Sequence, residues 1–191
     1  MSATGRGARG GAGRDSFPTP DWLTEAILPH LEPRLRAIGA WDSLTVYEPA
    51  CGEAQAIAKV IKRKWPHASV TTSDIVAPWN VDFLTTAPTA AYDLIITNPP
   101  FKLAYEFIQR AQQWKRTPDS LVVMLLRFQF LGSKKRAKWL RQFTPAVAVT
   151  PKRPSFSLNR HGKPGVDFTE YAWMLWPGTA PQLVILETED C

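Results

Sequence analysis

The stretch Asp93-Leu94-Ile95-Ile96-Thr97-Asn98-Pro99-Pro100-Phe101 carries the strongest signal in this chain. Residues 93–97 are an apolar run that predicts a buried strand. Proline fixes its own φ and restricts the residue before it to extended conformations, so the two prolines stiffen the backbone at Asn98. The Asn98 side-chain oxygen and the Pro99 carbonyl then converge on one point, where they suit an amino group that donates two hydrogens.

Phe101 adds a flat apolar face on which a heteroaromatic ring can stack. The alternative is a Pro-rich turn that closes a strand, with Phe101 in the core. We take Asn98, Pro99, Pro100 and Phe101 as candidate catalytic residues, because the segments that precede them favour a binding site.

The chain alternates apolar strand-like runs with helical patterns over most of its length. Near-continuous apolar strands in such an order favour a mostly parallel sheet with helices on both faces, which is a doubly wound α/β fold. The expected strands are 44–47, 68–74, 93–97, 121–128, 146–150, 168–176 and 183–187, with a short element at 81–84. One expected helix follows a cap at Thr19 or Asp21. Three further helices are expected at 53–65, 103–114 and 133–143.

Length and composition bound the class of protein. The 191 residues, 45% of them hydrophobic, predict one globular domain over 17–191, after a disordered Gly/Arg-rich tail at 1–16. No apolar stretch is long enough for a membrane span and none resembles a signal peptide, so we expect a cytoplasmic protein. The net charge of +6 favours a polyanionic partner.

Metal chemistry is not expected. The two cysteines and three histidines are scattered, without the spacing of metal ligands.

The ends of the first two expected strands carry the pattern of a nucleoside site. Gly52 permits a tight turn and a close approach of a ligand to the backbone, and Asp74 follows at the spacing of a carboxylate that accepts ribose hydroxyls. The sequence has neither a GxGxxG fingerprint nor a phosphate loop. A nucleoside without phosphates therefore fits better than NAD or ATP.

The order of these segments resembles class I S-adenosylmethionine-dependent methyltransferases that modify amino groups. Within that class the chain is most similar to small phage and prophage DNA adenine N6-methyltransferases. The resemblance implies a Rossmann-like, seven-stranded sheet with an antiparallel strand near the C-terminus. The segments that carry it are 17–20 (FPTP), 48–52 (EPACG), 73–75 (SDI), 82–84 (DFL), 98–101 (NPPF) and 171–176 (YAWMLW).

The resemblance also implies a cofactor, S-adenosylmethionine, and a set of residues around it. These are Phe17, Thr19, Pro20, Glu48, Ala50, Cys51, Gly52, Asp74, Ile75, Asp82, Phe83 and Asn98. Core packing is the alternative for Phe17 and Phe83, and exposed turns are the alternative for the two aspartates. Ala54 stands where the family usually has a second glycine, which puts cofactor affinity in question.

A base inside a duplex cannot reach such a site, so it must be flipped out and stacked on Phe101. Phe156 is a candidate for the opposite wall, with a place in the core as the alternative. Basic residues before and after the strand at 146–150 are candidates for phosphate contacts, against the alternative of solvated surface charges. They are Lys134, Lys135, Lys138, Arg141, Lys152, Arg153 and Arg160.

The leading hypothesis is methylation of adenine N6 in DNA. We expect low sequence selectivity or a very short recognition site, because no separate recognition domain is visible. An rRNA or tRNA base methyltransferase is the runner-up, since Asn-Pro-Pro-aromatic motifs occur there too. Glutamine methylation of a protein is less favoured, because Phe101 stands where Tyr is usual. A catalytically silent nucleic-acid-binding module is the fourth hypothesis. The sequence does not indicate an oligomeric state.

Overall fold

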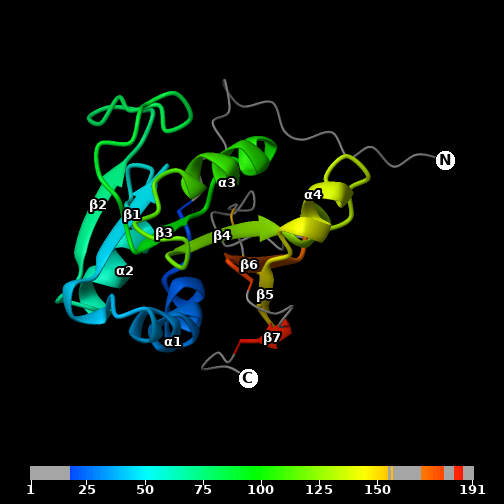
Figure 1. Ribbon diagram of the computed structural model, residues 1–191, viewed down its shortest axis with the longest axis horizontal. Helices are drawn as coiled ribbons and strands as arrows, with labels where there is room; N and C mark the ends of the chain where they lie inside the picture. Colours follow the sequence, from blue (N-terminus) through cyan, green and yellow to red (C-terminus); the bar gives the residue numbers. More distant parts are fainter. Residues whose placement is uncertain (1–17, 155, 157–168, 179–182, 187–191) are drawn as a thin grey trace, which may run out of the picture.

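The computed structural model describes residues 18–154, 156, 169–178 and 183–186 (Figure 1). The expected tail at 1–16 lies outside this part of the chain. One sheet has the strand order β2-β1-β3-β4-β6-β5-β7. The strands are β1 Thr45–Pro49, β2 Ser69–Ser73, β3 Leu94–Thr97, β4 Leu121–Arg127, β5 Ala146–Val149, β6 Tyr171–Trp176 and β7 Leu183–Ile185.

The sheet is parallel except for β6. β1 pairs in parallel with β2 and β3, and β3 pairs in parallel with β4. β6 lies antiparallel between β4 and β5. The predicted α/β fold with a late antiparallel strand is therefore confirmed. Its body consists of the six strands that have four or more residues, whereas β7 adds only three residues at the edge, beside β5.

Helices cover both faces of this sheet (Figure 1). α1 Asp21–Ala37 and α2 Ala56–Lys64 pack on the face that carries Val46, Leu94 and Val123. α3 Ala104–Gln112 and α4 Ala137–Gln142 pack on the other face. Side chains of neighbouring strand residues point to opposite faces, so each central strand contributes to both cores. Short 3-10 helices span Trp41–Ser43, Phe101–Leu103 and Phe128–Phe130.

Three helix starts differ from the sequence-based expectation. Pro20 occupies the cap position of α1 without a side-chain cap, so neither Thr19 nor Asp21 caps that helix. α2 begins at Ala56 because Gln55 has a left-handed conformation, with φ +47°. α4 begins at Ala137, because the preceding residues form a turn in which the Arg136 guanidinium donates to the Phe130 carbonyl. The short element expected at 81–84 is a turn, in which the Thr85 N–H donates to the Asp82 carbonyl over 3.2 Å.

α1 is attached to the sheet by a buried hydrogen bond as well as by apolar contacts. The Trp173 indole N–H donates to the Leu23 carbonyl over 2.9 Å, and both side chains are fully buried. This bond joins the first helix to the antiparallel strand β6. A buried carbonyl that loses its donor costs about 1–3 kcal/mol.

Replacement of Trp173 by Phe is therefore expected to lower the free energy of unfolding by about 2 kcal/mol or more, since it also leaves a void. The midpoint of urea denaturation should fall while its slope stays unchanged. Leu183→Ala is the control, because Leu183 is 67% exposed. A Trp173→Phe midpoint equal to that of the control would contradict the stabilising role of this bond.

Candidate functional site

The carboxyl ends of β1, β2 and β3 meet at one edge of the sheet. Pro49, the last residue of β1, lies opposite Ser73, the last residue of β2. The Cys51 N–H donates to the Ser73 carbonyl over 2.9 Å, and the Thr97 hydroxyl donates to the Pro49 carbonyl. The segments that follow the three strands are thus tied together, at the edge where doubly wound sheets bind ligands.

The loop after β1 is shaped by left-handed backbone and by one carboxylate. Ala50 and Gly52 have φ of +59° and +60°. The Gly52 N–H donates to Asp74 Oδ2 over 2.8 Å, and the Val76 N–H donates to Asp74 Oδ1 over 3.0 Å. Asp74 therefore fixes its own loop and the loop after β1. An ionised carboxylate has about four acceptor positions, so about two remain for a ligand.

Ala54, the residue that differs from the family pattern, is exposed in the turn that follows Gly52. Its methyl group therefore does not displace the core beneath the loop.

Asn98, which follows β3 directly, has one amide atom paired and one unpaired. Asn98 Nδ2 donates to the Thr19 hydroxyl over 3.2 Å, although the two residues are 79 positions apart. Asn98 Oδ1 is buried and has no hydrogen-bond partner within the described part of the chain. Burial without a partner is costly, so this oxygen suits a ligand donor. Among the described residues, the Pro99 carbonyl accepts no hydrogen bond either, whereas the Pro100 carbonyl accepts the Leu103 N–H.

Two aromatic rings pack on Tyr171, and one of them belongs to the Asn-Pro-Pro-Phe segment. Phe101 and Phe156 both pack on the Tyr171 ring, with centroid distances of 5.5 and 4.8 Å. Both rings are partly buried, whereas Tyr171 is 2% exposed. The structure therefore brings Phe156 close to the Asn-Pro-Pro-Phe segment through a shared neighbour. The core role that the sequence left open for Phe101 and for Phe156 also holds in part, because both pack on the core cluster.

The segments after β2 present one apolar and one acidic side chain. Ile75 is 66% exposed, and it follows Asp74 directly. The Val81 N–H donates to the Asp74 carbonyl over 2.8 Å, which places the partly buried Asp82 close by. Asp82 Oδ1 accepts the Leu84 N–H over 3.0 Å.

Phe83 is a core residue in this structure, which is the alternative that the sequence left open. It is 3% exposed, and its ring packs on Tyr47, Phe107 and Trp114. These rings enclose the Phe83 side chain, and a contact of this residue with a cofactor stays a prediction.

Glu48 and Cys51 are buried beneath the loop after β1. Glu48 is 2% exposed, and its Oε2 accepts the Ala58 N–H of α2 over 2.8 Å. Burial raises the pKa of Glu48 from 4.5 to about 8, so the carboxyl is mostly protonated at neutral pH. Burial likewise raises the pKa of the Cys51 thiol to about 12, which makes it a poor nucleophile.

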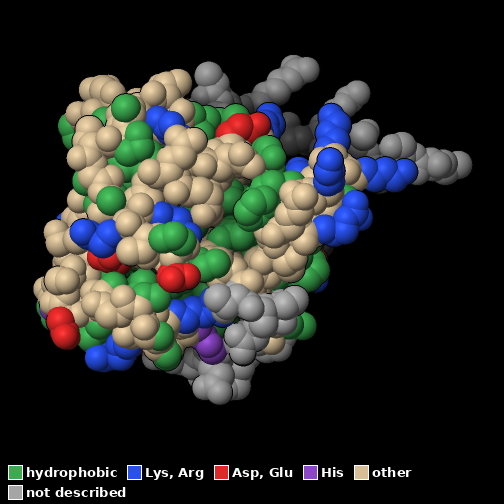
Figure 2. Space-filling model, viewed as in Figure 1, with side chains coloured by type: hydrophobic (Ala, Val, Ile, Leu, Met, Phe, Trp, Pro, Cys, Tyr) green, Lys and Arg blue, Asp and Glu red, His purple; other side chains and the backbone are tan. Residues whose placement is uncertain are grey.

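The predicted basic residues fall into two groups. Lys134, Lys135, Lys138 and Arg141 are exposed in and before α4, and Figure 2 shows Lys and Arg side chains gathered at that edge of the molecule. Only Lys138 and Arg141 lie on the helix itself, because α4 is shorter than expected.

The second group has partners on the protein. Arg153 forms an ion pair with Glu170, and the Lys152 ammonium lies over the Trp22 ring, 5.7 Å from its centroid. Phe17 and Arg160 lie outside the described residues.

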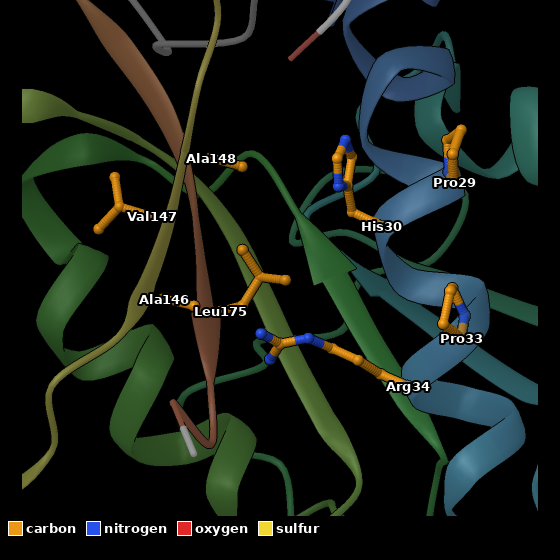
Figure 3. Close-up of a pocket in the computed structure, with 8 residues that line it drawn as sticks. All are labelled: Pro29, His30, Pro33, Arg34, Ala146, Val147, Ala148 and Leu175. Carbon is orange, nitrogen blue, oxygen red and sulfur yellow. The ribbon is translucent and has the colours of Figure 1, made fainter. Parts of the chain in front are cut away.

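Two cavities lie away from the strand ends that follow β1, β2 and β3. The first, of about 250 Å³, lies between α1 and strands β5 and β6 (Figure 3). It is lined by Pro29, His30, Pro33, Arg34, Ala146, Val147, Ala148 and Leu175. The second, of about 320 Å³, is lined in part by Asp93, which directly precedes β3, and by Arg116. None of the predicted site residues lines either cavity.

Two findings bear on other classes of function. No cluster of three or more His, Cys, Asp or Glu side chains that could hold a metal ion occurs in the described part of the chain. Of the helices within the same residues, none combines the length and the apolarity needed to cross a membrane.

Sequence reasoning missed Thr97, Tyr171 and Arg127 as site residues. Thr97 joins β3 to β1, and Tyr171 holds both candidate stacking rings. Arg127 lies with its guanidinium over the Phe101 ring. Its position as a charged residue at the end of the apolar run 121–126 is the signal that could have identified it.

No family model and no curated protein matches this sequence. Solved structures share its fold. A putative class I S-adenosylmethionine-dependent methyltransferase from Listeria monocytogenes aligns with a TM-score of 0.65 and 14% identity, over 92% of this chain and 68% of that one. The fold is therefore that of class I methyltransferases.

Two further structures are informative. The methyltransferase subunit of a type I restriction-modification system from Streptococcus thermophilus aligns with a TM-score of 0.59 and 12% identity, over 83% of this chain. The match spans less than half, 44%, of that subunit. The plantazolicin methyltransferase BpumL, crystallised with SAH, aligns with a TM-score of 0.51 and 13% identity, over 81% of this chain and 84% of that one.

The raised pKa of Glu48 predicts a pH-dependent stability. Between pH 4.5 and about 8 the unfolded chain loses the Glu48 proton while the folded protein keeps it. The unfolded state then binds fewer protons, so the contribution of Glu48 to stability, complete below pH 4.5, falls as the pH rises through this window. The loss is about 1.4 kcal/mol per pH unit.

Glu48→Gln keeps an acceptor for the Ala58 N–H and removes this titration, so it should flatten the dependence of the unfolding free energy on pH. Urea denaturation at pH 5, 6.5 and 8 measures it. Glu53→Gln, at an exposed position five residues along, is the matched control and should keep the wild-type slope. Equal slopes in the two variants would exclude a raised pKa at Glu48.

Proposed function

We propose that this protein transfers a methyl group from S-adenosylmethionine to the exocyclic N6 of adenine in DNA. The observation that carries the proposal is the buried, unpartnered Oδ1 of Asn98 at the carboxyl end of β3. An adenine amino group has the two hydrogens that this oxygen and the neighbouring Pro99 carbonyl would accept. The fold of class I methyltransferases, and its occurrence in a restriction-modification subunit, support this proposal.

The residues at the ends of β1 and β2 fit S-adenosylmethionine. The free acceptor positions of Asp74 would bind the ribose hydroxyls, and the exposed Ile75 would cover the adenine ring. Asp82 follows Val81, whose N–H donates to the Asp74 carbonyl. It would accept a hydrogen bond from the amino group of the cofactor's adenine. The methionine part would lie along Thr19, Pro20, Glu48 and the loop of Ala50, Cys51 and Gly52. Phe17 stays a prediction for this end of the site.

The amino nitrogen of adenine is a poor nucleophile because its lone pair is delocalised into the ring. Two acceptors on its hydrogens favour the pyramidal form, in which the lone pair is localised, and stabilise the positive charge that develops. S-adenosylmethionine, when bound, supplies the electrophilic methyl group: the new N–C bond forms as the S–C bond breaks. The methylated nitrogen then loses one proton to solvent, so Asn98 needs no basic group beside it.

The substrate base would leave the duplex to reach Asn98. Phe101 would stack on it, with Phe156 beside it and Tyr171 behind both rings. The exposed cations in and before α4, together with Lys152 and Arg153, would contact DNA phosphates. Contacts to phosphate carry no sequence information, so we expect low selectivity or a short recognition site, which mapping of methylated positions on plasmid DNA would reveal.

The deciding experiment offers labelled S-adenosylmethionine to the protein with unmethylated DNA, total RNA and protein in parallel. Label in DNA that is recovered as N6-methyladenine supports the proposal. Label confined to RNA, or to protein, would replace it with a methyltransferase of that substrate. Saturable cofactor binding without any label would contradict the proposed transfer.

Asn98→Ala should lower the rate of methyl transfer by about 10²–10³-fold, because it removes one preorganised acceptor from the transition state. The rate is measured as label in DNA per minute at saturating cofactor. A cooperative thermal unfolding transition shows that the variant is folded. Transfer at the wild-type rate would mean that another group orients the amino nitrogen.

Thr19→Val should lower kcat about 10-fold, because the Asn98 amide loses the hydroxyl that orients it. Valine has nearly the same shape as threonine, so the change is chiefly the loss of one acceptor. Thr19→Ser keeps the hydroxyl and is the matched control, expected to stay close to wild type. If both variants show the same kcat, the orientation of Asn98 does not depend on this bond.

A further inference from the structure

Arg127 lies where the proposed base site opens. It is the last residue of β4, the strand next to β3 in the sheet, and its side chain is exposed. Its guanidinium lies over the Phe101 ring, 4.7 Å from the centroid. Among the described residues, Arg127 has no ion pair and its side chain makes no hydrogen bond. This cation therefore contacts the stacking ring without being neutralised by a carboxylate.

The neighbours of Arg127 determine which contact can be exchanged. Tyr171 pairs with Arg127 across β4 and β6, and its ring also touches Phe101. Because Tyr171 is 2% exposed, its ring is fixed in the core. Glu170, the acidic residue beside Tyr171, is already paired with Arg153. The exposed guanidinium is thus the group over Phe101 that can move away when a base arrives.

We propose that Arg127 positions the target nucleotide: its guanidinium covers Phe101 in the free protein, yields the ring to the flipped base, and then binds a phosphate of that nucleotide. This proposal rests on the proposed function and extends it to a specific substrate contact.

Guanidinium chemistry suits both states. The planar group stacks on an aromatic face, and its fork of N–H donors matches two phosphate oxygens. The released guanidinium stays near the base, because it is anchored at the end of β4. Lysine would keep the charge but would lose the stacking and the bidentate geometry.

The test compares Arg127→Met with Arg127→Lys in steady-state methylation of DNA at several salt concentrations. Arg127→Met keeps much of the apolar stem and removes the charge. We expect its KM for DNA to rise about 10-fold with kcat nearly unchanged, and the slope of log KM against log salt to fall by about one. Arg127→Lys should keep the wild-type salt slope. Cofactor affinity should be the same in all variants.

Arg36→Met is the matched control. Arg36 is also an exposed arginine over an aromatic ring, 4.4 Å from the centroid of Trp41, but it lies near the far end of α1. It should leave KM and salt slope at wild-type values. Wild-type KM and salt slope in Arg127→Met, in an enzyme that labels DNA, would overturn the role of Arg127 alone. Absence of label from DNA with the wild type would overturn the proposed function, and this role with it.

Discussion

The parallel pairing of β1 with β2 and β3 is the constraint on which the rest of the structure depends. It places three strand ends at one edge, where the polar backbone groups beyond the strands need partners. Side chains next to those ends supply many of them: Asp74 accepts from Gly52, and Thr97 donates to Pro49. The same bonds that satisfy the backbone also fix the loops. Scaffold and candidate site are therefore stabilised by one set of contacts.

The strands were predictable because their signal is local. Leu94–Thr97 and residues 121–126 are buried on both faces, so they appear as nearly continuous hydrophobic segments. Helix starts were not predictable in this way. α2 starts late because Gln55 is left-handed, and α4 starts late because Arg136 bonds a carbonyl outside the helix. A left-handed residue other than glycine and a side-chain bond to a carbonyl six residues earlier leave the apolar periodicity unchanged, so that periodicity does not reveal them.

The candidate site divides along the same line. Asn98 and Asp74 directly follow strands and Gly52 lies three residues after one, so position in the sequence was enough to propose them as site residues. Their hydrogen-bond partners were not predictable in this way. The hydroxyl that holds Asn98 comes from Thr19, 79 residues away, and the rings of Phe101 and Phe156 both contact Tyr171. The core position of the Phe83 ring could not be predicted, because an aromatic residue beside a predicted binding carboxylate has the same local pattern whether it faces a ligand or the core.

The position of β6 has a consequence for biosynthesis. β6 lies between β4 and β5, and both of these neighbours precede it in the chain. As the ribosome delivers the chain from its N-terminus, β4 keeps an open edge and β5 has no partner until residues 171–176 emerge. The six residues of β6 are all buried in the folded protein. Until they are synthesised, the edges of β4 and β5 that pair with β6 stay uncovered. Nascent chains paused before this strand would be the form most prone to aggregation or to capture by chaperones.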